Sequence, residues 1–486
     1  MDSMEPSKLL FDPKAKYVYL ASGLYILLAL LGLVTENFWV LAIPFALLVV
    51  WFAVFRLDWL MLTITALIPL GITLTDKQFN LGLSLPTEPL LFGVLSLVIV
   101  RFLMTGQVNV KLLKHPLSII IWVYLLWMFV TTLTSSMPLV SLKHLIARLW
   151  FIIPFYVVMS QVFRKDKVNI DRFFALYLGA LCVAAIYTIY THSQYSFSKQ
   201  SSTWVMFPFY KEHTSWGAAL AMYYPVSWVF LLRGKLTPAL RLAAGVAVGI
   251  MTLALILSYT RAAWVSVVGA AAVYFVVRFK VKWYLLVLAG MGVVLFGFAN
   301  QEAILNKFNK NTQDSSEKLT EHVQSISNIS TDASNLERIN RWNSALRMFS
   351  ERPHVGWGPG TYMFVYAPFQ KPHEKTIIST NGGNRGNAHS EYIGPLAESG
   401  VMGLLTVLGL VVGFSIYGVK VYYRLDDQRL RSLGMAAMLG LVTYFTHGLL
   451  NNFLDMDKLS LPVWGFMAVI VSLDLYYDPS KTQRKG

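Results

Sequence analysis

Long apolar segments separated by short polar breaks run along almost the whole chain. Each is roughly long enough to cross a hydrocarbon core of about 30 Å as an α-helix. The pattern predicts about fourteen transmembrane helices, or about twelve where short breaks join neighbouring segments. They are expected near residues 17–34, 38–55, 59–74, 88–104, 116–134, 144–162, 172–191, 214–232, 239–257, 262–278, 283–299, 390–418, 432–449 and 460–476. The sequence therefore predicts an all-α polytopic membrane protein.

Lysine and arginine are distributed unevenly between alternate loops of this predicted bundle. Basic residues gather in the loops near residues 101–114, 164–172, 233–241, 278–282 and 420–431, whereas the intervening short loops contain few. Cytoplasmic loops carry the positive excess in membrane proteins. These basic loops and both termini are therefore expected in the cytoplasm, which leaves one large, mostly helical loop outside.

This topology divides the chain into three parts. Residues 1–299 are predicted to form a transmembrane bundle of about eleven helices. Residues 300–388 form the large periplasmic loop. Residues 389–486 add about three transmembrane helices and a short cytoplasmic tail.

The composition is that of a membrane protein, and it limits the classes of binding partner that must be considered. Hydrophobic residues make up 55% of the chain and charged residues 14%, against about 25% in soluble domains. The formal net charge of +15 is spread over many cytoplasmic loops, so it requires no nucleic-acid partner. Cys182 falls in an apolar segment, where a small buried side chain is the economical interpretation. The sequence contains no D-x-D pair or His/Cys cluster that suggests a metal, and no cofactor is predicted.

An amphipathic helix is predicted inside the external loop. Ser334 and Glu337 have the spacing of a capping box, and Pro353 ends the pattern. Its apolar face is expected to consist of Ile339, Trp342, Leu346 and Phe349.

Three arginines occupy different positions on this helix. Arg338 falls on the apolar face, Arg341 lies at its margin, and Arg347 points away with Asn340 and Asn343, as a solvated arginine does. A cation on an apolar face either extends its charged end to water or headgroups, or binds a buried anion. The helical pattern leaves both interpretations of Arg338 open.

Two further arginines lie in predicted membrane segments. Arg261, in "SYTRAAWVSV", begins a segment otherwise free of charge at its external edge, and Arg148 lies deeper in "HLIARLWFIIPFY". Ionisable groups at membrane depth are costly and are therefore candidates for function. An interfacial anchor is the alternative for Arg261.

A polar cluster precedes the twelfth predicted helix. His389 stands at its first turn, and Glu391 and Glu398, seven residues apart, share one helical face. A helix N-terminus disfavours imidazolium, so it helps to keep the histidine in the neutral form that a general base requires. His389 is either a base or an interfacial hydrogen-bonding residue. The glutamates either orient it or cap and stabilise the helix.

Another polar cluster, Lys211, Glu212 and His213 in "FPFYKEHTSWGAA", stands at an external helix entrance. It either lines a path for a substrate or forms an ordinary interfacial cluster.

The motifs "SYTRAAW", "ERINRWNSALRMFSERPHVGWGPGTY" and "NAHSEYIGPLAESGVMGLL" resemble, in order and spacing, the O-antigen ligase and polymerase superfamily of bacterial envelope enzymes. The resemblance is specific over roughly residues 255–418 and topological elsewhere. It implies a GT-C-like membrane glycosyltransferase, independent of metal, at the periplasmic face of the inner membrane. The implied donor is a glycan on undecaprenyl diphosphate, and the implied acceptor is a glycan, lipid or protein.

Residue by residue, the resemblance implies that Arg261 and Arg338 bind the diphosphate and that His389 serves the acceptor. Supporting roles are assigned to a wider set: Arg341, Glu398, Glu391, Arg148, Lys211 and His213. Many members have Asn after the histidine, whereas Ser390 follows it in this chain. A polytopic transporter of ions or of the lipid-linked glycan, without catalysis, is the alternative, although paired broken helices in two related halves are not evident in the sequence.

Overall fold

The structure is a computed structural model of the 486-residue chain. It describes residues 15–36, 40–41, 43–76, 81–234, 236–282, 333–376, 379 and 386–479. The apolar segment predicted at 283–299 lies outside these residues. The chain divides into two compact units, Met1–Met61 and Leu62–Gly486. The predicted boundaries at residues 299 and 388 remain predictions.

The first unit contains apolar helices. They are α2 (Ala15–Val34) and α3 (Ile43–Phe55), and α4 (Leu57–Leu67) begins in this unit. α2 and α3 have no acidic residue in the first turn and no basic residue in the last turn. Such helices, apolar around their whole circumference, are typical of membrane spans or buried core.

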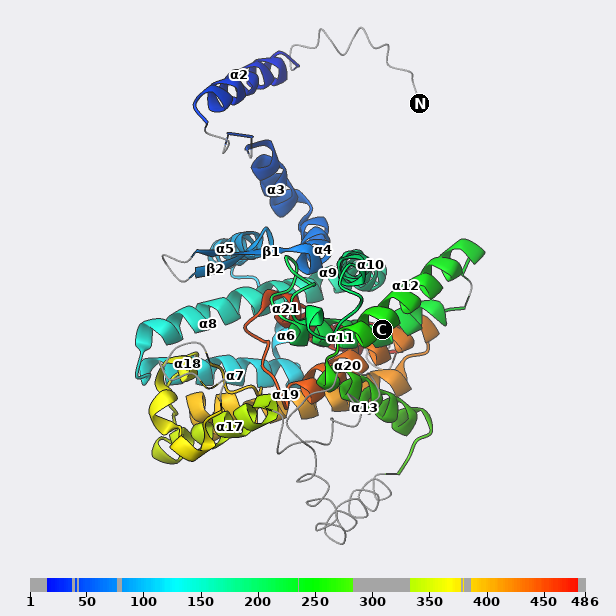
Figure 1. Ribbon diagram of the computed structural model, residues 1–486. Coiled ribbons are helices and arrows are strands. Elements are labelled where there is room, and N and C mark those ends of the chain that lie inside the picture. The colour runs from blue at the N-terminus through cyan, green and yellow to red at the C-terminus, as the bar shows by residue number, and fades with distance from the viewer. Residues whose placement is uncertain are drawn as a thin grey trace. The chain divides into compact units, whose positions relative to one another are not determined.

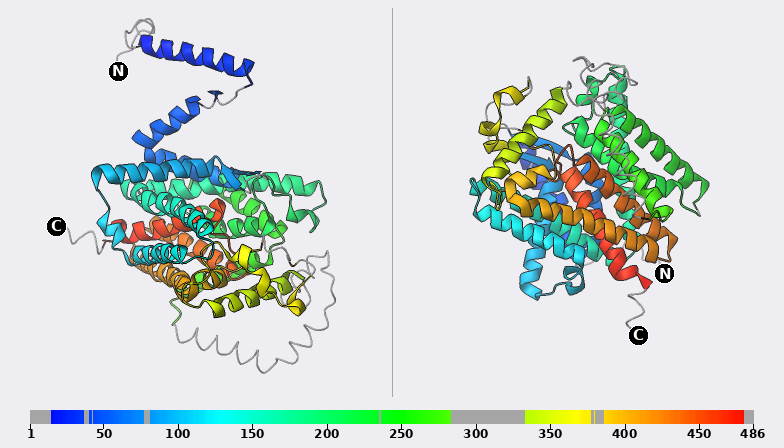
Figure 2. Two further views of the ribbon diagram at one scale, coloured as in Figure 1. Left: turned by 90° about the vertical axis from the view of Figure 1, so that its left-hand side faces the viewer. Right: turned by 90° about the horizontal axis from the view of Figure 1, so that it is seen from below.

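The second unit is a helical bundle (Figures 1 and 2). Its longer helices are α5 (Thr87–Thr105), α7 (Pro116–Leu133), α8 (Pro138–Ile152), α10 (Val168–Ser193), α11 (His213–Leu231), α12 (Pro238–Leu257), α13 (Arg261–Arg278), α17 (Ala333–Glu351), α19 (Ile393–Arg424), α20 (Gln428–His447) and α21 (Asp457–Ser472). Shorter pieces are α6 (Val110–Leu113), η3 (Ile153–Val158), α9 (Met159–Lys165), α18 (Tyr362–Val365) and η8 (Leu473–Tyr477).

The core of this unit is α21. Every residue of this helix is buried, and it packs against α8, α9, α11, α19 and α20. α20 in turn packs against α11, α13 and α19. α21, which follows the 448–456 loop, is thus packed on several sides. Its N-terminus therefore fixes the C-terminal end of that loop.

Eight of the described helices are long and apolar enough to cross a membrane. They are Thr87–Thr105, Pro116–Leu133, Pro138–Lys165, Val168–Ser193, Pro238–Leu257, Arg261–Arg278, Ile393–Arg424 and Asp457–Tyr477. Shorter apolar helices are Tyr19–Val34, Ile43–Phe55 and Leu57–Leu70. The predicted all-α polytopic membrane fold is confirmed. The total of about fourteen spans remains a prediction.

The helix predicted at 59–74 is wrong in its last part. α4 ends at Leu67, η2 (Ile68–Leu70) follows, and β1 (Ile72–Asp76) pairs antiparallel with β2 (Leu81–Leu85). Pro69 lacks an N–H, and the sequences "ITLTD" and "LGLSL" favour strands through β-branched residues and alternation. Hydropathy alone did not distinguish the start of β1 from the end of a membrane helix.

The helix predicted in the external loop is confirmed as α17, but its predicted inner face is wrong. The buried side chains are Glu337, Asn340, Arg341, Ser344, Ala345 and Met348, whereas Leu346 of the apolar stripe is 45% exposed. The side chain of Ser334, and with it the capping box, lies outside the described residues. Polar groups face inward on α17 because they find hydrogen-bond partners there.

The side of α17 that was predicted to face solvent also makes hydrogen bonds with other parts of the protein. Arg347 donates to Glu374 at 2.5 and 3.2 Å and to the Phe369 carbonyl at 2.6 Å. Asn340 is 1% exposed and donates to Gln370 at 2.9 Å. The loop after α17 therefore folds back over the side that the helical wheel assigned to water.

α19 is broken near its start at Gly400, where φ is 68° and ψ is −166°, a region that is essentially restricted to glycine. The break exposes backbone groups that pair with the glycine-rich loop after α17. Gly358 N donates to the Glu398 carbonyl at 2.8 Å, and Val401 N donates to the Pro353 carbonyl at 3.0 Å. A Cβ on Gly400 would lie 2.2 Å from the His354 carbonyl oxygen. The short segment 393–399 is thus set at a fixed angle beneath the loop.

Gly400→Ala is expected to destabilise the protein by about 1–3 kcal/mol, because alanine tolerates neither this φ nor the contact with His354. The matched control is Gly249→Ala in α12, where nothing lies within 4 Å of the added Cβ and alanine is the better helix former. Thermal unfolding in detergent measures both. Equal midpoints for the two variants would contradict the proposed strain.

Candidate active site

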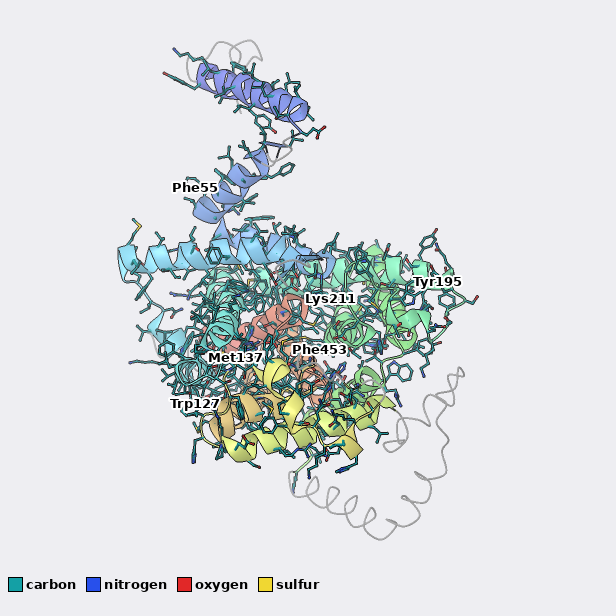
Figure 3. The ribbon with its side chains drawn as sticks, turned by 60° about the vertical axis from the view of Figure 1, so that its left-hand side comes forward. Phe55, Trp127, Met137, Tyr195, Lys211 and Phe453 are labelled. Atoms are coloured by element: carbon teal, nitrogen blue, oxygen red, sulfur yellow. The ribbon has the colours of Figure 1, made fainter. Side chains whose placement is uncertain are left out.

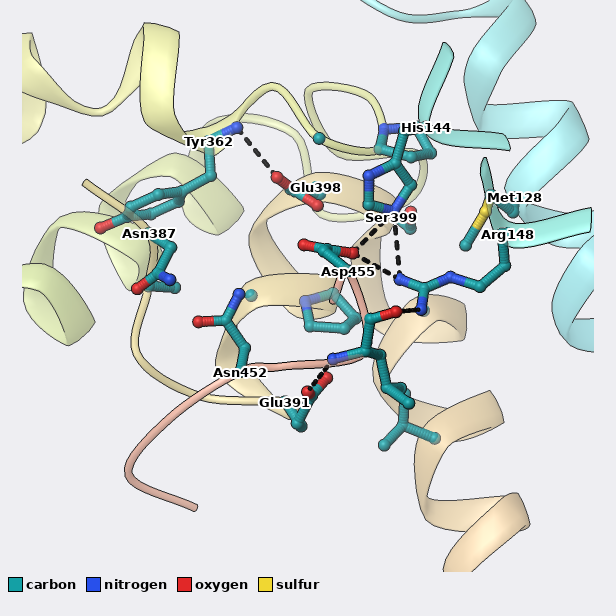
Figure 4. Close-up of a pocket in the computed structure, with 18 of the residues that line it drawn as sticks. Met128, His144, Arg148, Tyr362, Asn387, Glu391, Glu398, Ser399, Asn452 and Asp455 are labelled. Atoms are coloured by element: carbon teal, nitrogen blue, oxygen red, sulfur yellow. Dashed lines mark hydrogen bonds and ion pairs between the residues drawn. The ribbon is translucent and has the colours of Figure 1, made fainter. Parts of the chain in front are cut away.

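A cavity of about 210 Å³ lies between α7, α8, the start of α19 and the loops that flank it. Its lining residues come from Tyr124–Met128, His144 and Arg148, residues 359–363, residues 387–407 and the loop before α21. Figure 4 shows these side chains converging from segments far apart in the sequence. Of the predicted site residues, Arg148, Glu391 and Glu398 line this cavity.

Arg148 forms the cationic wall of the cavity. It is 5% exposed, and its Nη2 donates to Asp455 Oδ1 at 2.7 Å. The same nitrogen lies 3.3 Å from His144 Nε2, one turn earlier on α8, and Nη1 donates to the Leu454 carbonyl. A buried guanidinium needs such partners. Arg148 therefore anchors the loop before α21 to α8.

Glu391 ties the same loop to the start of α19. Its Oε1 accepts hydrogen bonds from Tyr444 Oη at 2.5 Å and from the backbone N–H groups of Phe453 and Leu454 at 2.6 and 2.9 Å. Burial raises the pKa of Glu391, against the effect of the Tyr444 hydrogen bond. These contacts differ from both expected roles, since the carboxylate binds the 448–456 loop.

Glu398 stands two residues before the break in α19 and faces the glycine-rich loop. Its Oε1 accepts a hydrogen bond from the backbone N–H of Tyr362 at 2.9 Å. The start of α19 is instead satisfied by Ser390, whose Oγ accepts from the N–H groups of Tyr392 and Ile393 at 3.2 and 3.3 Å. Serine is a favourable residue at a helix start, so Ser390 has a structural role here.

His389 lies in a strained loop. Its φ of 48° is in the left-handed region, and its backbone N–H donates to Asn387 Oδ1 at 3.1 Å. Such conformations cost free energy and are found where the surroundings enforce them, often at functional sites. The neighbours Ala388 and Ser390 are buried and line the cavity, whereas His389 is half-buried and is not among the lining residues.

Arg341 holds this loop from the side of α17. It is 6% exposed, its Nη1 donates to the Asn387 carbonyl at 3.0 Å, and its Nε donates to Glu337 at 2.7 Å. Although burial acts in the opposite direction, hydrogen bonds from Ser379, Arg341 and Thr376 hold the pKa of Glu337 below its usual value. Residues 386–391 are therefore placed between α17 and the cavity.

Arg338, one turn before Arg341, contacts the other loop. Its Nε donates to the Leu450 carbonyl at 3.2 Å. Burial, followed by the positive charges of Arg341 and Arg338, lowers the pKa of His389 to about 3, against the charge of Glu337. The structure thus brings the predicted histidine into electrostatic reach of both arginines, and the imidazole is neutral near pH 7.

The remaining candidates lie at the starts of α11 and α13. Thr260, which precedes Arg261, donates through Oγ1 to the His213 carbonyl at 2.8 Å. Burial raises the pKa of Glu212, and the charges of Lys211 and Arg338 oppose this shift. Arg338 is therefore also within electrostatic reach of the cluster that contains Lys211 and His213. Lys211 is exposed, and its position is labelled in Figure 3.

Three residues that line the cavity, Asp455, His144 and Asn452, were not among the predicted site residues. Two signals were available. His144 and Arg148 are four residues apart and so share a helix face. The stretch "NNFLDMD" places amides and carboxylates between two apolar segments, at a point where the chain re-enters the membrane bundle.

The fold and this site define a multi-pass membrane protein with a charged cavity at helix ends, of a type compatible with glycosyl transfer. Residues 246–408 match the family model described as O-Antigen ligase, Wzy_C. A comparison with curated proteins found no match. The chain thus contains a domain of the O-antigen ligase family, and the predicted resemblance is confirmed over a segment that includes Arg261, Arg338 and His389. At this coarse level the match supports a membrane glycosyltransferase of the ligase or polymerase type.

Proposed function

We propose that this protein is an inner-membrane glycosyltransferase that transfers a glycan from undecaprenyl diphosphate to an acceptor, without a metal. The observation that carries the proposal is the position of His389, in a loop between the arginines of α17 and a buried cavity lined by carboxylates. One side of this loop suits a diphosphate and the other suits a hydroxyl-bearing molecule.

Arg338 and Arg261 bind the diphosphate and stabilise its charge as it leaves the anomeric carbon. The acceptor hydroxyl oxygen attacks that carbon, the bond between carbon and diphosphate oxygen breaks, and the hydroxyl proton moves to His389. The products are the glycosylated acceptor, undecaprenyl diphosphate and a proton on imidazole. Arg341, with Glu337, positions the loop rather than the substrate.

A histidine with a pKa of about 3 is a weak base. A bound diphosphate adds negative charge beside it and offsets the charges of Arg338 and Arg341, so the pKa rises when the donor is present. The donor therefore activates the base, and the free enzyme keeps the imidazole neutral and ready to accept a proton.

The test is transfer by purified protein with a lipid-linked glycan, without ATP or an ion gradient and with a chelator present. We expect a longer lipid-linked glycan or a glycan on a different acceptor. A transporter would leave the donor chemically unchanged under these conditions, and that result would support the alternative function.

The site is expected to face the periplasm, because the basic loops lie on the opposite side. In intact cells, an impermeant maleimide should label a cysteine introduced at the exposed position Lys371 but not one at Gln428, which labels only after the membrane is opened. The reverse pattern would invert the topology.

Arg341→Lys is expected to reduce the transfer rate more than Arg347→Lys. Lysine at 341 retains the charge but cannot contact Glu337 and the Asn387 carbonyl in the same way, so the His389 loop loses its anchor. Arg347 is the matched control, since it lies on the same helix but pairs with Glu374. The measurement is the single-turnover rate, with thermal stability of both variants checked. Equal rates would remove the positioning role.

A further inference from the structure

We propose that two adjoining cavities form one carbohydrate-binding site with two compartments, in which the second compartment takes the sugar ring next to the one that reacts. The larger cavity lies beneath residues 386–391. The smaller, of about 100 Å³, lies between the β1–β2 hairpin, the start of α5, the segment before α11 and the start of α21. Asp455 lines both. This inference rests on the proposed function and identifies where its glycan binds.

The larger compartment has the chemistry of a site for sugar hydroxyls. Glu391 and Glu398 both line this compartment, and each has Oε1 fixed by hydrogen bonds from the protein. Carboxylate oxygens held in this way accept hydrogen bonds from hydroxyl groups. The rings of Tyr124, Trp127 and Tyr362 supply apolar walls.

The charge of this compartment excludes a second diphosphate. Three carboxylates, those of Glu391, Glu398 and Asp455, face one guanidinium, that of Arg148, which Asp455 already binds. Phosphate oxygens brought among these carboxylates would be repelled. A neutral sugar, or one that carries an amino group, is therefore the ligand class, and the diphosphate belongs on the arginine side of the His389 loop.

The smaller compartment presents Glu88 and Lys211 to a ligand. Two other charged residues of its lining already have structural partners. Asp457 accepts from Thr87 Oγ1 at 2.7 Å, and Lys458 Nζ donates to the Ile68 and Gly71 carbonyls at 3.1 and 2.6 Å. Phe209 and Tyr210 add aromatic surface. This compartment repeats the pattern of the larger one, with polar groups beside aromatic rings.

Asp455 is fixed at the junction by Arg148, so the boundary between the compartments is built into the fold. The separate volumes, about 210 and about 100 Å³, are small. Together they just reach the lower end of the range for small-ligand pockets, about 300 Å³. A ligand that extends past Asp455 therefore contacts more of the site than a single ring does.

The experiment uses cysteine protection in a Cys182→Ser background, so that no native thiol reacts. Ser399→Cys reports on the larger compartment and Thr73→Cys on the smaller, with Ser215→Cys as a replacement if Thr73→Cys does not fold. Gln428→Cys, exposed at the start of α20, is the control. The probes are the free glycan released by mild acid from the lipid-linked oligosaccharide of cells lacking this protein, and the monosaccharides obtained from it by complete hydrolysis.

We expect the free glycan, at ten times its dissociation constant, to slow modification by a small uncharged maleimide about tenfold at Ser399→Cys and Thr73→Cys. The monosaccharides should protect Ser399→Cys alone, and neither probe should protect Gln428→Cys. Protection of Ser399→Cys alone by the whole glycan would overturn the second compartment. Protection at neither site, or equal protection at Gln428→Cys, would overturn the carbohydrate assignment. Transfer by the Cys182→Ser parent tests the proposed function separately.

Affinity for the donor glycan gives a second measurement. Glu88→Gln and Lys211→Ala should raise the KM for the lipid-linked glycan severalfold with kcat nearly unchanged, because both residues contact the ring remote from the reaction. A fall in kcat with unchanged KM would place these residues elsewhere in the mechanism and contradict the second compartment.

Discussion

Replacing His389 by alanine is expected to lower the rate of transfer by about 10² to 10⁴, the usual cost of losing a general base. The protein should still insert, fold and retain the lipid-linked donor, because the imidazole is half-buried and the donor is held by arginines. Histidine tolerates a φ of 48° better than alanine does, so the thermal stability of the variant is compared with that of the parent. The measurement is single-turnover transfer in nanodiscs.

His373→Ala is the matched control, since this exposed histidine lies in the same external region. It should transfer at the parental rate. If His389→Ala transfers at a rate within a few-fold of the parent, the catalytic role is contradicted. His389 would then be an interfacial residue at a helix end.

The pH dependence separates a donor-activated base from an ordinary histidine. In the free protein the pKa of His389 is about 3, below the unfolded value of about 6.5. The unfolded chain binds the proton more readily, so this residue's contribution to stability is complete above about pH 6.5 and is lost as the pH falls toward 3. The protonation of His389 should therefore leave kcat/KM unchanged between about pH 7 and 5, whereas kcat, which reports the donor complex, should fall with a higher apparent pKa. Identical profiles would argue against activation by the donor.

The helical architecture was predictable because hydropathy reports directly on membrane insertion. The β1–β2 hairpin was missed because the apolar segment predicted at 59–74 continues into the start of β1, and only Pro69 and the alternation of residues indicate strands. The exposure of Leu346 and the burial of Asn340 on α17 show a second limit. A helical wheel assumes that apolar residues face inward, and this fails where polar residues have hydrogen-bond partners inside.

The candidate site was predictable in part. His389 and Arg338 could be predicted as candidates because each places an ionisable group beside apolar residues. The structure brings the two side chains within electrostatic reach of each other. Asp455 was not predicted as a site residue because its role depends on an ion pair with Arg148, which is 307 residues away. No local sequence pattern indicates that pair. The role of Arg341 in holding Asn387 likewise depends on a loop that returns to α17. Local chemistry is visible in a sequence, whereas the convergence of distant loops depends on tertiary structure.

Arg338→Ala and Arg261→Ala are each expected to lower transfer by about 10² to 10³, the range found when one preorganised group that stabilises transition-state charge is removed. Arg338 is the sharper case, because its charge acts on both His389 and Glu212, which precedes α11. Lysine at either position should restore little activity, since it lacks the planar fork that binds two phosphate oxygens.

The control for Arg338 is Arg347→Ala, which removes an arginine from the same helix but from a pair with Glu374. Donor affinity and single-turnover rate are measured together for each variant. Loss of rate with some loss of donor affinity is expected for Arg338→Ala and Arg261→Ala, with near-parental values for Arg347→Ala. Full activity in Arg338→Ala would mean that this guanidinium does not bind the diphosphate, which would then have to bind elsewhere.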